Sequence, residues 1–187
     1  VKIPVKIDFR RKNIVILILE SFGREYIGAM NKDLDDGNYR GFTPNIDSLV
    51  ERSLTFDYSF ANGRKSIDGM PSILSSIPMF VEPFFLTSSS MNDVSGIAGE
   101  LGKEGYHSAF FHGAPNGSMG FEAFAKATGF KEYYGKDEYE SDKRFGGKDD
   151  FDGSWGGAVP AVFRQDDERF PRAVCQCGVH SIEPSSV

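Results

Sequence analysis

Several features are scarce in this sequence, and each shortage excludes a class of protein. No apolar run approaches the roughly 20 residues of a membrane-spanning helix, and the start shows no secretory signal peptide. Lysine and arginine are scattered, and the net charge of −6 argues against a surface that binds nucleic acid. Cys175 and Cys177 lack the second cysteine pair that a structural zinc site needs, and they are too close together to form a useful disulfide.

The composition is that of an acidic globular domain. Of the 187 residues, 40% are hydrophobic and 26% are charged, which is ordinary for such a domain. This length is sufficient for one domain with a substantial core. The 17 phenylalanines and 7 tyrosines predict a core or groove that is rich in phenylalanine.

The chain is organised around one apolar stretch near its start. Ile14 to Leu19 are six consecutive aliphatic residues with no polar alternation, which predicts a strand buried on both faces, as in a parallel sheet covered by helices. The run ends on Glu20. In open α/β sheets, ligands bind beyond the carboxyl ends of the strands, so Glu20 is a candidate to hold a metal or substrate. The alternative is that Glu20 only begins a solvated loop.

The remainder of the chain alternates between helical and extended patterns. Thr43 and Pro44 predict the start of a helix, with Thr43 as its N-cap. The other expected elements are a strand at 54–60, a helix at 67–76, a helix at 94–104, a strand at 108–111, a helix at 119–128 and a short strand at 133–134. This order predicts an α/β fold with a doubly wound, mainly parallel sheet and helices on both faces.

A second candidate residue is Ser66, which stands where the helix after Gly63 would begin. Backbone N–H groups and the positive end of the helix dipole stabilise negative charge at such a position, on a phosphoryl group or on an attacking alkoxide. Arg64 and Lys65 would add positive charge near a phosphate or sulfate. The alternatives are an ordinary serine N-cap and two solvated loop cations.

A third candidate, His112, follows the strand at 108–111. Glu20, Ser66 and His112 thus lie in three separate segments, each at an element end on one expected edge of the sheet. A carboxylate and a hydroxyl can share one divalent ion, which lowers the pKa of the hydroxyl and makes it a usable nucleophile.

Four stretches together carry a resemblance to a known family. They are N-I-V-I-L-I-L-E-S-F-G, T-P-N-I-D-S-L, S-F-A-N-G-R-K-S-I-D-G-M-P-S-I-L and F-F-H-G-A. They resemble the sulfatase-type catalytic domain of the alkaline phosphatase superfamily, and most closely its lipoteichoic acid synthase-like branch of membrane phosphoglycerol transferases. The resemblance runs from about Asn13 to Trp155.

The resemblance implies roles for the candidate residues. Glu20 would be a metal ligand, Ser66 the nucleophile at the position where the synthases use threonine, and His112 a contact to the substrate head group. The metal would be Mn²⁺ or a similar divalent ion, and the reaction would pass through a phospho-enzyme formed from a lipid donor such as phosphatidylglycerol. Members of this branch usually carry transmembrane helices before a catalytic domain that faces the periplasm or the cell exterior.

Two departures from the family pattern bear on the chemistry. Arylsulfatases form formylglycine within a C/S-x-P-x-R motif, and Ser66-Ile67-Asp68 has no proline at the required place. That disfavours sulfatase chemistry and favours direct attack by serine. Gly120 to Ala123 also replace the F-W-N-R-type sequence of the synthases, which leaves specificity for glycerol phosphate open.

The last departure concerns the end of the chain. The family completes its metal site with a downstream Asp-His pair, which this sequence does not contain, and residues 157–187 are unlike the family. We therefore expect residues 1–156 to be the N-terminal part of the catalytic domain, followed by a tail translated out of frame, and we expect weak metal binding and little turnover. The alternatives are a sulfuric or phosphoric ester hydrolase and a non-catalytic remnant that binds a head group.

Overall fold

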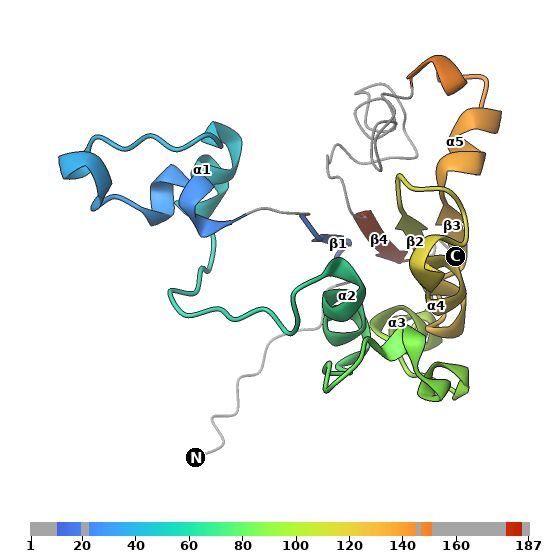
Figure 1. The fold of residues 1–187 in the computed structure, drawn as a ribbon. Coiled ribbons are helices and arrows are strands. Elements are labelled where there is room, and N and C mark those ends of the chain that lie inside the picture. Colours follow the sequence, from blue (N-terminus) through green and yellow to red (C-terminus); the bar gives the residue numbers. More distant parts are fainter. Residues whose placement is uncertain (1–10, 20–22, 145–146, 151–178, 185–187) are drawn as a thin grey trace. The chain divides into compact units, whose positions relative to one another are not determined.

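The structure is a computed structural model that describes residues 11–19, 23–144, 147–150 and 179–184. The chain divides into two compact units (Figure 1). The larger unit comprises Val1–Ile18 and Asn62–Val187, and the smaller unit comprises Leu19–Ala61. Each unit is described by itself below.

The larger unit is built on a four-stranded sheet with the order β1-β4-β2-β3. Its strands are β1 (Ile14–Leu17), β2 (Tyr106–Phe111), β3 (Glu132–Tyr134) and β4 (Val179–Pro184). β2 and β3 pair in parallel, whereas β4 pairs antiparallel with both β1 and β2. β1, β2 and β3 therefore run in the same direction, and β4 runs opposite to them. The expected α/β fold with parallel strands and helices is confirmed.

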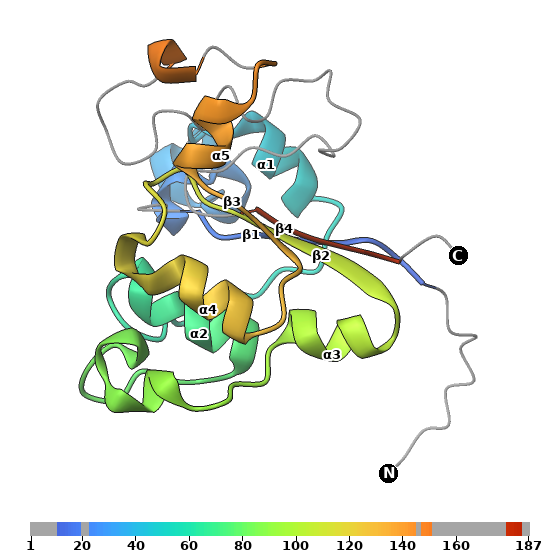
Figure 2. The same ribbon diagram turned by 90° about the vertical axis from the view of Figure 1, so that its right-hand side faces the viewer.

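Helices lie on both sides of this sheet. They are α2 (Ser66–Ser75), α3 (Ile97–Lys103), α4 (Phe121–Ala127) and α5 (Lys136–Ser141). Figure 2 shows α2, α3 and α4 below the sheet and α5 above it. None of the helices in the described ranges combines the length and apolarity that a bilayer span requires.

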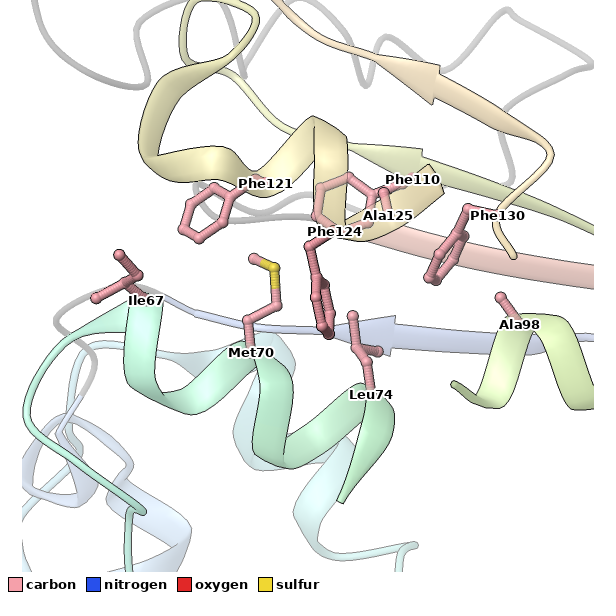
Figure 3. Packing of buried hydrophobic residues seen from close by; sticks show 9 residues of the cluster. All are labelled: Ile67, Met70, Leu74, Ala98, Phe110, Phe121, Phe124, Ala125 and Phe130. Carbon is pink, nitrogen blue, oxygen red and sulfur yellow. The ribbon is translucent and has the colours of Figure 1, made fainter. Parts of the chain in front are cut away.

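The core of the larger unit is rich in phenylalanine, as the composition predicts. Figure 3 shows Ile67, Met70 and Leu74 of α2 facing phenylalanine side chains. These three residues follow the i, i+3, i+7 spacing of a buried helix face. Phe110 of β2 is fully buried at the centre, and the ring of Phe130 meets it edge-on with 5.5 Å between centroids. The core thus joins α2 and α4 to the sheet.

In its described residues, 19 and 23–61, the smaller unit contains one α-helix and several short 3-10 turns. Its elements are η1 (Arg24–Tyr26), η2 (Gly28–Met30), η3 (Leu34–Gly37) and α1 (Pro44–Val50). The helix begins where the sequence predicts, but Thr43 makes no N-cap hydrogen bond. Its hydroxyl instead donates to the carbonyl of Tyr26 over 3.3 Å. Asp47 ties α1 to η2 by accepting the backbone N–H of Ala29 at 3.1 Å.

The structure corrects two expectations. Residues 54–60 form no strand, and their large side chains are exposed, because no described segment pairs with them. β1 is not buried on both faces, since Val15 and Leu17 are 42% and 43% exposed while Ile16 packs against the core. The structure also has a helix beyond the expected elements: α5 follows Gly135, whose backbone N–H donates to the Glu138 carboxylate at 2.7 Å.

The structure describes part of the tail formed by residues 157–187. Residues 179–184 form β4 between β1 and β2. Residues 157–178, with Cys175 and Cys177, lie outside the described residues, as do residues 185–187. The division of the chain at residue 156 and the altered reading frame stay predictions.

Candidate functional site

Ser66 is the first residue of α2. The N-cap residue is Lys65, with an extended backbone at φ −134° and ψ 156°. The alternative that Ser66 is an ordinary N-cap is therefore wrong, whereas its predicted place at the start of a helix is confirmed. The helix has ten residues, so Ser66 stands at the positive end of a well-developed helix dipole.

The turn before Ser66 is fixed by the carboxylate of Asp68. This side chain is only 3% exposed. Its Oδ2 atom accepts the backbone N–H groups of Arg64 at 3.1 Å and Lys65 at 3.2 Å. Gly63 has a φ of +104°, and a Cβ there would lie 2.2 Å from the Cβ of Asp68. The turn therefore needs both the acid at 68 and a glycine at 63.

The side chains of Arg64 and Lys65 are directed to solvent. Both residues are exposed, and neither side chain takes part in the salt bridges found among the described residues. Their backbones are held by Asp68 while their charged groups remain available. The segment can therefore present two cations beside a hydroxyl at a helix N-terminus.

His112 directly follows β2 and is 7% exposed. Its ring meets the ring of Phe121 edge-on, with 4.7 Å between centroids. Its backbone N–H donates to the carbonyl of Tyr134 at 2.9 Å, which continues the pairing of β2 with β3. Burial lowers the pKa of the imidazole from 6.5 to about 4. His112 is therefore neutral at pH 7.

The loop after His112 is tied to the start of α5. The side-chain amide of Asn116 donates to the two oxygens of the Glu138 carboxylate at 3.0 and 2.9 Å. The backbone N–H of Lys136 donates to the carbonyl of Ala114 at 3.2 Å. These bonds fix the backbone that leaves the sheet beyond His112, so the imidazole is held from both its strand and its loop.

The core brings the Ser66 and His112 segments to one end of the larger unit. Ile67, the neighbour of Ser66, and Phe121, on which His112 packs, belong to the same buried cluster. Figure 3 shows Ile67 and Phe121 at the same end of this cluster, away from Ala98 and Phe130. The segments of Ser66 and His112 therefore contact the same end of the hydrophobic core.

The third predicted segment cannot be compared with them, because Glu20 lies outside the described residues. Among the residues that the structure does describe, no group of three or more His, Cys, Asp or Glu side chains could hold a metal ion. Asp68, the acid nearest to Ser66 in sequence, uses Oδ2 for two backbone bonds, and its Oδ1 is buried without a partner. The described residues alone thus do not form a metal site, and a shared ion between Glu20 and Ser66 stays a prediction.

Sequence reasoning missed two residues that shape the site. Asp68 has a recognisable signal, since an acid three residues after the N-cap commonly bonds the backbone N–H of the cap. Phe121 has no such signal, because its contact with His112 arises from packing between α4 and β2.

Comparison with known proteins identifies the family. The sulfatase family model matches residues 12–172. The chain belongs to the sulfatase family. The match includes the segments of Ser66 and His112, so both candidate residues lie within the sulfatase domain.

A solved structure supports the same relationship. The sulfatase domain is similar to the crystal structure of a protein in the alkaline phosphatase superfamily from Vibrio parahaemolyticus, with a TM-score of 0.69 and 26% sequence identity. The similarity covers 89% of this chain but 38% of that chain. The fold is therefore that of the alkaline phosphatase superfamily, and this chain spans well under half of that protein's length.

Proposed function

We propose that this sulfatase-family domain transfers or hydrolyses phosphate esters through a covalent intermediate on Ser66. The observation that carries the proposal is the position of Ser66 at the N-terminus of α2, after a turn that Asp68 holds in place. Membership of the sulfatase family supports an enzyme that acts on phosphate or sulfate esters. The C/S-x-P-x-R motif needed to form formylglycine has a proline where this chain has Asp68. Its absence favours direct attack by the serine hydroxyl.

The chemistry has two balanced steps. In the first step, Oγ of Ser66 attacks phosphorus, an O–P bond forms, and the bond from phosphorus to the leaving alcohol breaks. Ser66 loses its hydroxyl proton, and the leaving alkoxide takes one up. In the second step, the oxygen of water or of an acceptor alcohol attacks phosphorus, a new O–P bond forms, and the bond from phosphorus to Oγ of Ser66 breaks. The acceptor loses a proton, and Oγ of Ser66 takes one up. Hydrolysis and transfer differ only in this acceptor.

Each neighbouring residue has a proposed part in these steps. The N-terminus of α2 and the cations of Arg64 and Lys65 stabilise the negative charge of the ester and of the developing alkoxide. His112 is neutral at pH 7, so it contacts the substrate head group as a hydrogen-bonding group and not as a cation. Asp68 positions Ser66 without touching the substrate.

The finer identity of the enzyme is also a proposal. We place it in the phosphoglycerol transferase branch, with a lipid-linked donor and a position at the outer face of a membrane. Superfamily members typically use divalent metal ions, and we propose Mn²⁺ with Glu20 and Ser66 as ligands. When bound, the ion would lower the pKa of the serine hydroxyl.

The proposal is tested by trapping the intermediate. The 187-residue chain is incubated with Mn²⁺ and either p-nitrophenyl phosphate or phosphatidylglycerol, quenched in acid, and analysed by peptide mass spectrometry. We expect a phosphate or glycerol phosphate adduct on Ser66. Turnover by this chain should be slow, as expected for a domain without its downstream Asp-His pair, so the adduct and not product release is the readout. Ser66→Ala should abolish the adduct, whereas Ser66→Thr should retain part of it.

Ser75→Ala is the matched control, because this serine lies in the same helix and its hydroxyl is buried without a partner. It should leave the adduct unchanged. Turnover of p-nitrophenyl sulfate without any phosphoserine would instead favour a sulfuric ester hydrolase. No adduct in any variant, together with retained binding of the head group, would favour a non-catalytic remnant.

A further inference from the structure

The larger unit contains two Asn-Gly dipeptides, and the structure gives them different surroundings. Asn62-Gly63 lies in the turn that leads into α2, and Asn116-Gly117 lies in the loop that follows β2. An asparagine before glycine is especially prone to lose its side-chain amide, because glycine has no Cβ to hinder attack by its own nitrogen on the asparagine side chain. The hydrogen bonds around each asparagine therefore decide whether this reaction is open to it in the folded protein.

Asn62 is exposed, and its amide nitrogen makes no hydrogen bond within the described ranges. Its Oδ1 accepts the backbone N–H of Met79 at 2.8 Å. Such a donor stabilises the oxyanion that forms when a nucleophile attacks the side-chain carbonyl. The backbone N–H of Gly63 also has no acceptor in the part of the chain that the structure describes. The attacking nitrogen and the leaving amide are therefore both unrestrained, and the carbonyl between them is polarised.

The side chain of Asn116 is instead held at both of its polar atoms. Its amide nitrogen donates to the two oxygens of Glu138 at 3.0 and 2.9 Å. Its Oδ1 accepts the backbone N–H of Asp137 at 3.4 Å. These bonds fix the plane of the amide, whereas attack requires the carbonyl carbon to turn toward the nitrogen of Gly117. Reaction at Asn116 must therefore break contacts that the fold supplies.

We propose that Asn62 is a site of spontaneous deamidation in the folded protein and that the fold protects Asn116. The nitrogen of Gly63 attacks Cγ of Asn62, an N–C bond forms, the bond from Cγ to the amide nitrogen breaks, and ammonia leaves with the proton of Gly63. The product is a cyclic imide. Water then attacks one of its two carbonyl carbons, the bond from that carbon to the nitrogen breaks, and the nitrogen regains a proton. The new acid gives its proton to ammonia, which leaves an aspartate or an isoaspartate with a negative charge.

The modification changes the charge of the segment before Ser66. The cations of Arg64 and Lys65 are exposed, and a carboxylate shortly before them would offset their charge. An isoaspartate also lengthens the main chain next to Gly63, where even a Cβ would lie only 2.2 Å from the Cβ of Asp68. Deamidation should therefore weaken the hold of this segment on an anionic ester. That consequence rests on the proposed function, whereas the modification itself does not.

The test follows both asparagines in one sample. The 187-residue chain is incubated at neutral pH in water enriched in heavy oxygen, with and without urea. Peptide mass spectrometry then detects the change from amide to acid and the incorporated oxygen. In the folded chain, Asn62 should convert about tenfold faster than Asn116 or more, because ring closure at Asn116 loses additional hydrogen bonds. In urea, where these contacts are absent, the two rates should become similar.

Two variants serve as controls. Asn62→Gln keeps an amide at this position but would have to close a larger ring, so it should show no conversion there. Glu138→Ala removes the carboxylate that holds the amide of Asn116, and it should raise the rate at Asn116 while the rate at Asn62 stays the same. Circular dichroism of each variant checks that the fold is retained.

Other results overturn the inference. They are a folded chain in which Asn62 stays unmodified while the chain in urea converts it, or equal rates at the two asparagines in the folded chain. The consequence for the site is measured by the Ser66 adduct, which Asn62→Asp should form about fivefold more slowly than Asn62→Gln. Equal rates of adduct formation would overturn that consequence. If no variant forms an adduct, the proposed function fails while the measured deamidation stands.

Discussion

The Oδ2 atom of Asp68 accepts a hydrogen bond from the backbone N–H of Lys65 over 3.2 Å. Asp68 lies inside α2, whereas Lys65 is the residue that precedes Ser66. Asp68 accepts the N–H of Arg64 in the same way, at 3.1 Å. One buried carboxylate therefore fixes the direction in which the chain enters α2. The position of the Ser66 hydroxyl depends on this connection, since the carboxylate holds the two residues that lead into it.

The first prediction concerns this carboxylate. Asp68→Ala should lower the free energy of unfolding by about 2–3 kcal/mol, because it leaves two backbone N–H groups without their partner. Asp68→Asn keeps an acceptor oxygen and should cost about half as much. Urea unfolding measures both values. If the alanine variant were as stable as the original chain, the carboxylate would not fix the turn.

Asp68→Ala should also reduce formation of the Ser66 adduct, since the hydroxyl would lose its fixed position. The rate of adduct formation is measured with a saturating concentration of p-nitrophenyl phosphate. A loss of stability with an unchanged rate would assign Asp68 to the fold alone.

The second prediction compares two glycines in and before α2. Gly63→Ala should destabilise the protein by several kcal/mol, because its φ of +104° is unfavourable for alanine and the new Cβ would lie 2.2 Å from the Cβ of Asp68. Gly69→Ala should stabilise it by up to about 1 kcal/mol, because Gly69 lies inside the helix and a Cβ added there would meet nothing within 4 Å. Thermal unfolding of the two variants should shift in opposite directions.

The elements that the sequence predicts well are those whose signal is local. The apolar spacing of Ile67, Met70 and Leu74 predicts α2, and the structure has the helix there. Strands depend on partners that are far away in sequence. The alternating segment 54–60 has a strand pattern, yet the structure leaves it unpaired within the described residues.

The same distinction applies to the candidate site. Ser66 could be found from the sequence because it stands at the start of a helix, and His112 because it stands at the end of a strand. The packing of His112 on Phe121, and with it the low pKa of the imidazole, could not be found, because burial depends on the tertiary fold. Glu20 falls outside the described residues, so its role rests on the resemblance.

The third prediction concerns the pH dependence of stability. The folded protein protonates His112 only near pH 4, whereas the unfolded chain protonates it near the ordinary pKa of 6.5. Between these values the unfolded state binds more protons, so the free energy of unfolding should fall as the pH decreases from 6.5 to 4. The loss attributable to His112 is up to about 3 kcal/mol.

Denaturant unfolding across this pH range measures the effect. His112→Gln should give a flatter profile, because glutamine does not titrate. His107→Gln is the control, since His107 is exposed and its Nε2 lies 3.4 Å from Oε1 of Glu132. Profiles of equal slope in the original chain and in His112→Gln would contradict the prediction.

The fourth prediction concerns the hydroxyl of Tyr133. The ring of Tyr133 stacks on Phe110 with 5.4 Å between centroids, and its hydroxyl is buried without a hydrogen-bond partner. Burial, together with the nearby carboxylate of Glu122, raises the pKa of this phenol. Burial of a hydroxyl removes its hydrogen bonds to water, and without a new hydrogen bond this desolvation lowers the stability of the folded state. Tyr133→Phe should therefore stabilise the protein, by about 1 kcal/mol.

Tyr134→Phe provides the matched control on the adjacent residue. The hydroxyl of Tyr134 donates to the carboxylate of Glu132 at 2.5 Å, so its removal loses a hydrogen bond and should destabilise the protein slightly. Urea unfolding of the two variants should give changes of opposite sign. If Tyr133→Phe were instead destabilising by about 1 kcal/mol or more, on the order of one hydrogen bond, its hydroxyl would have a bonding partner in solution, and an ordered water at that position would be the group to look for.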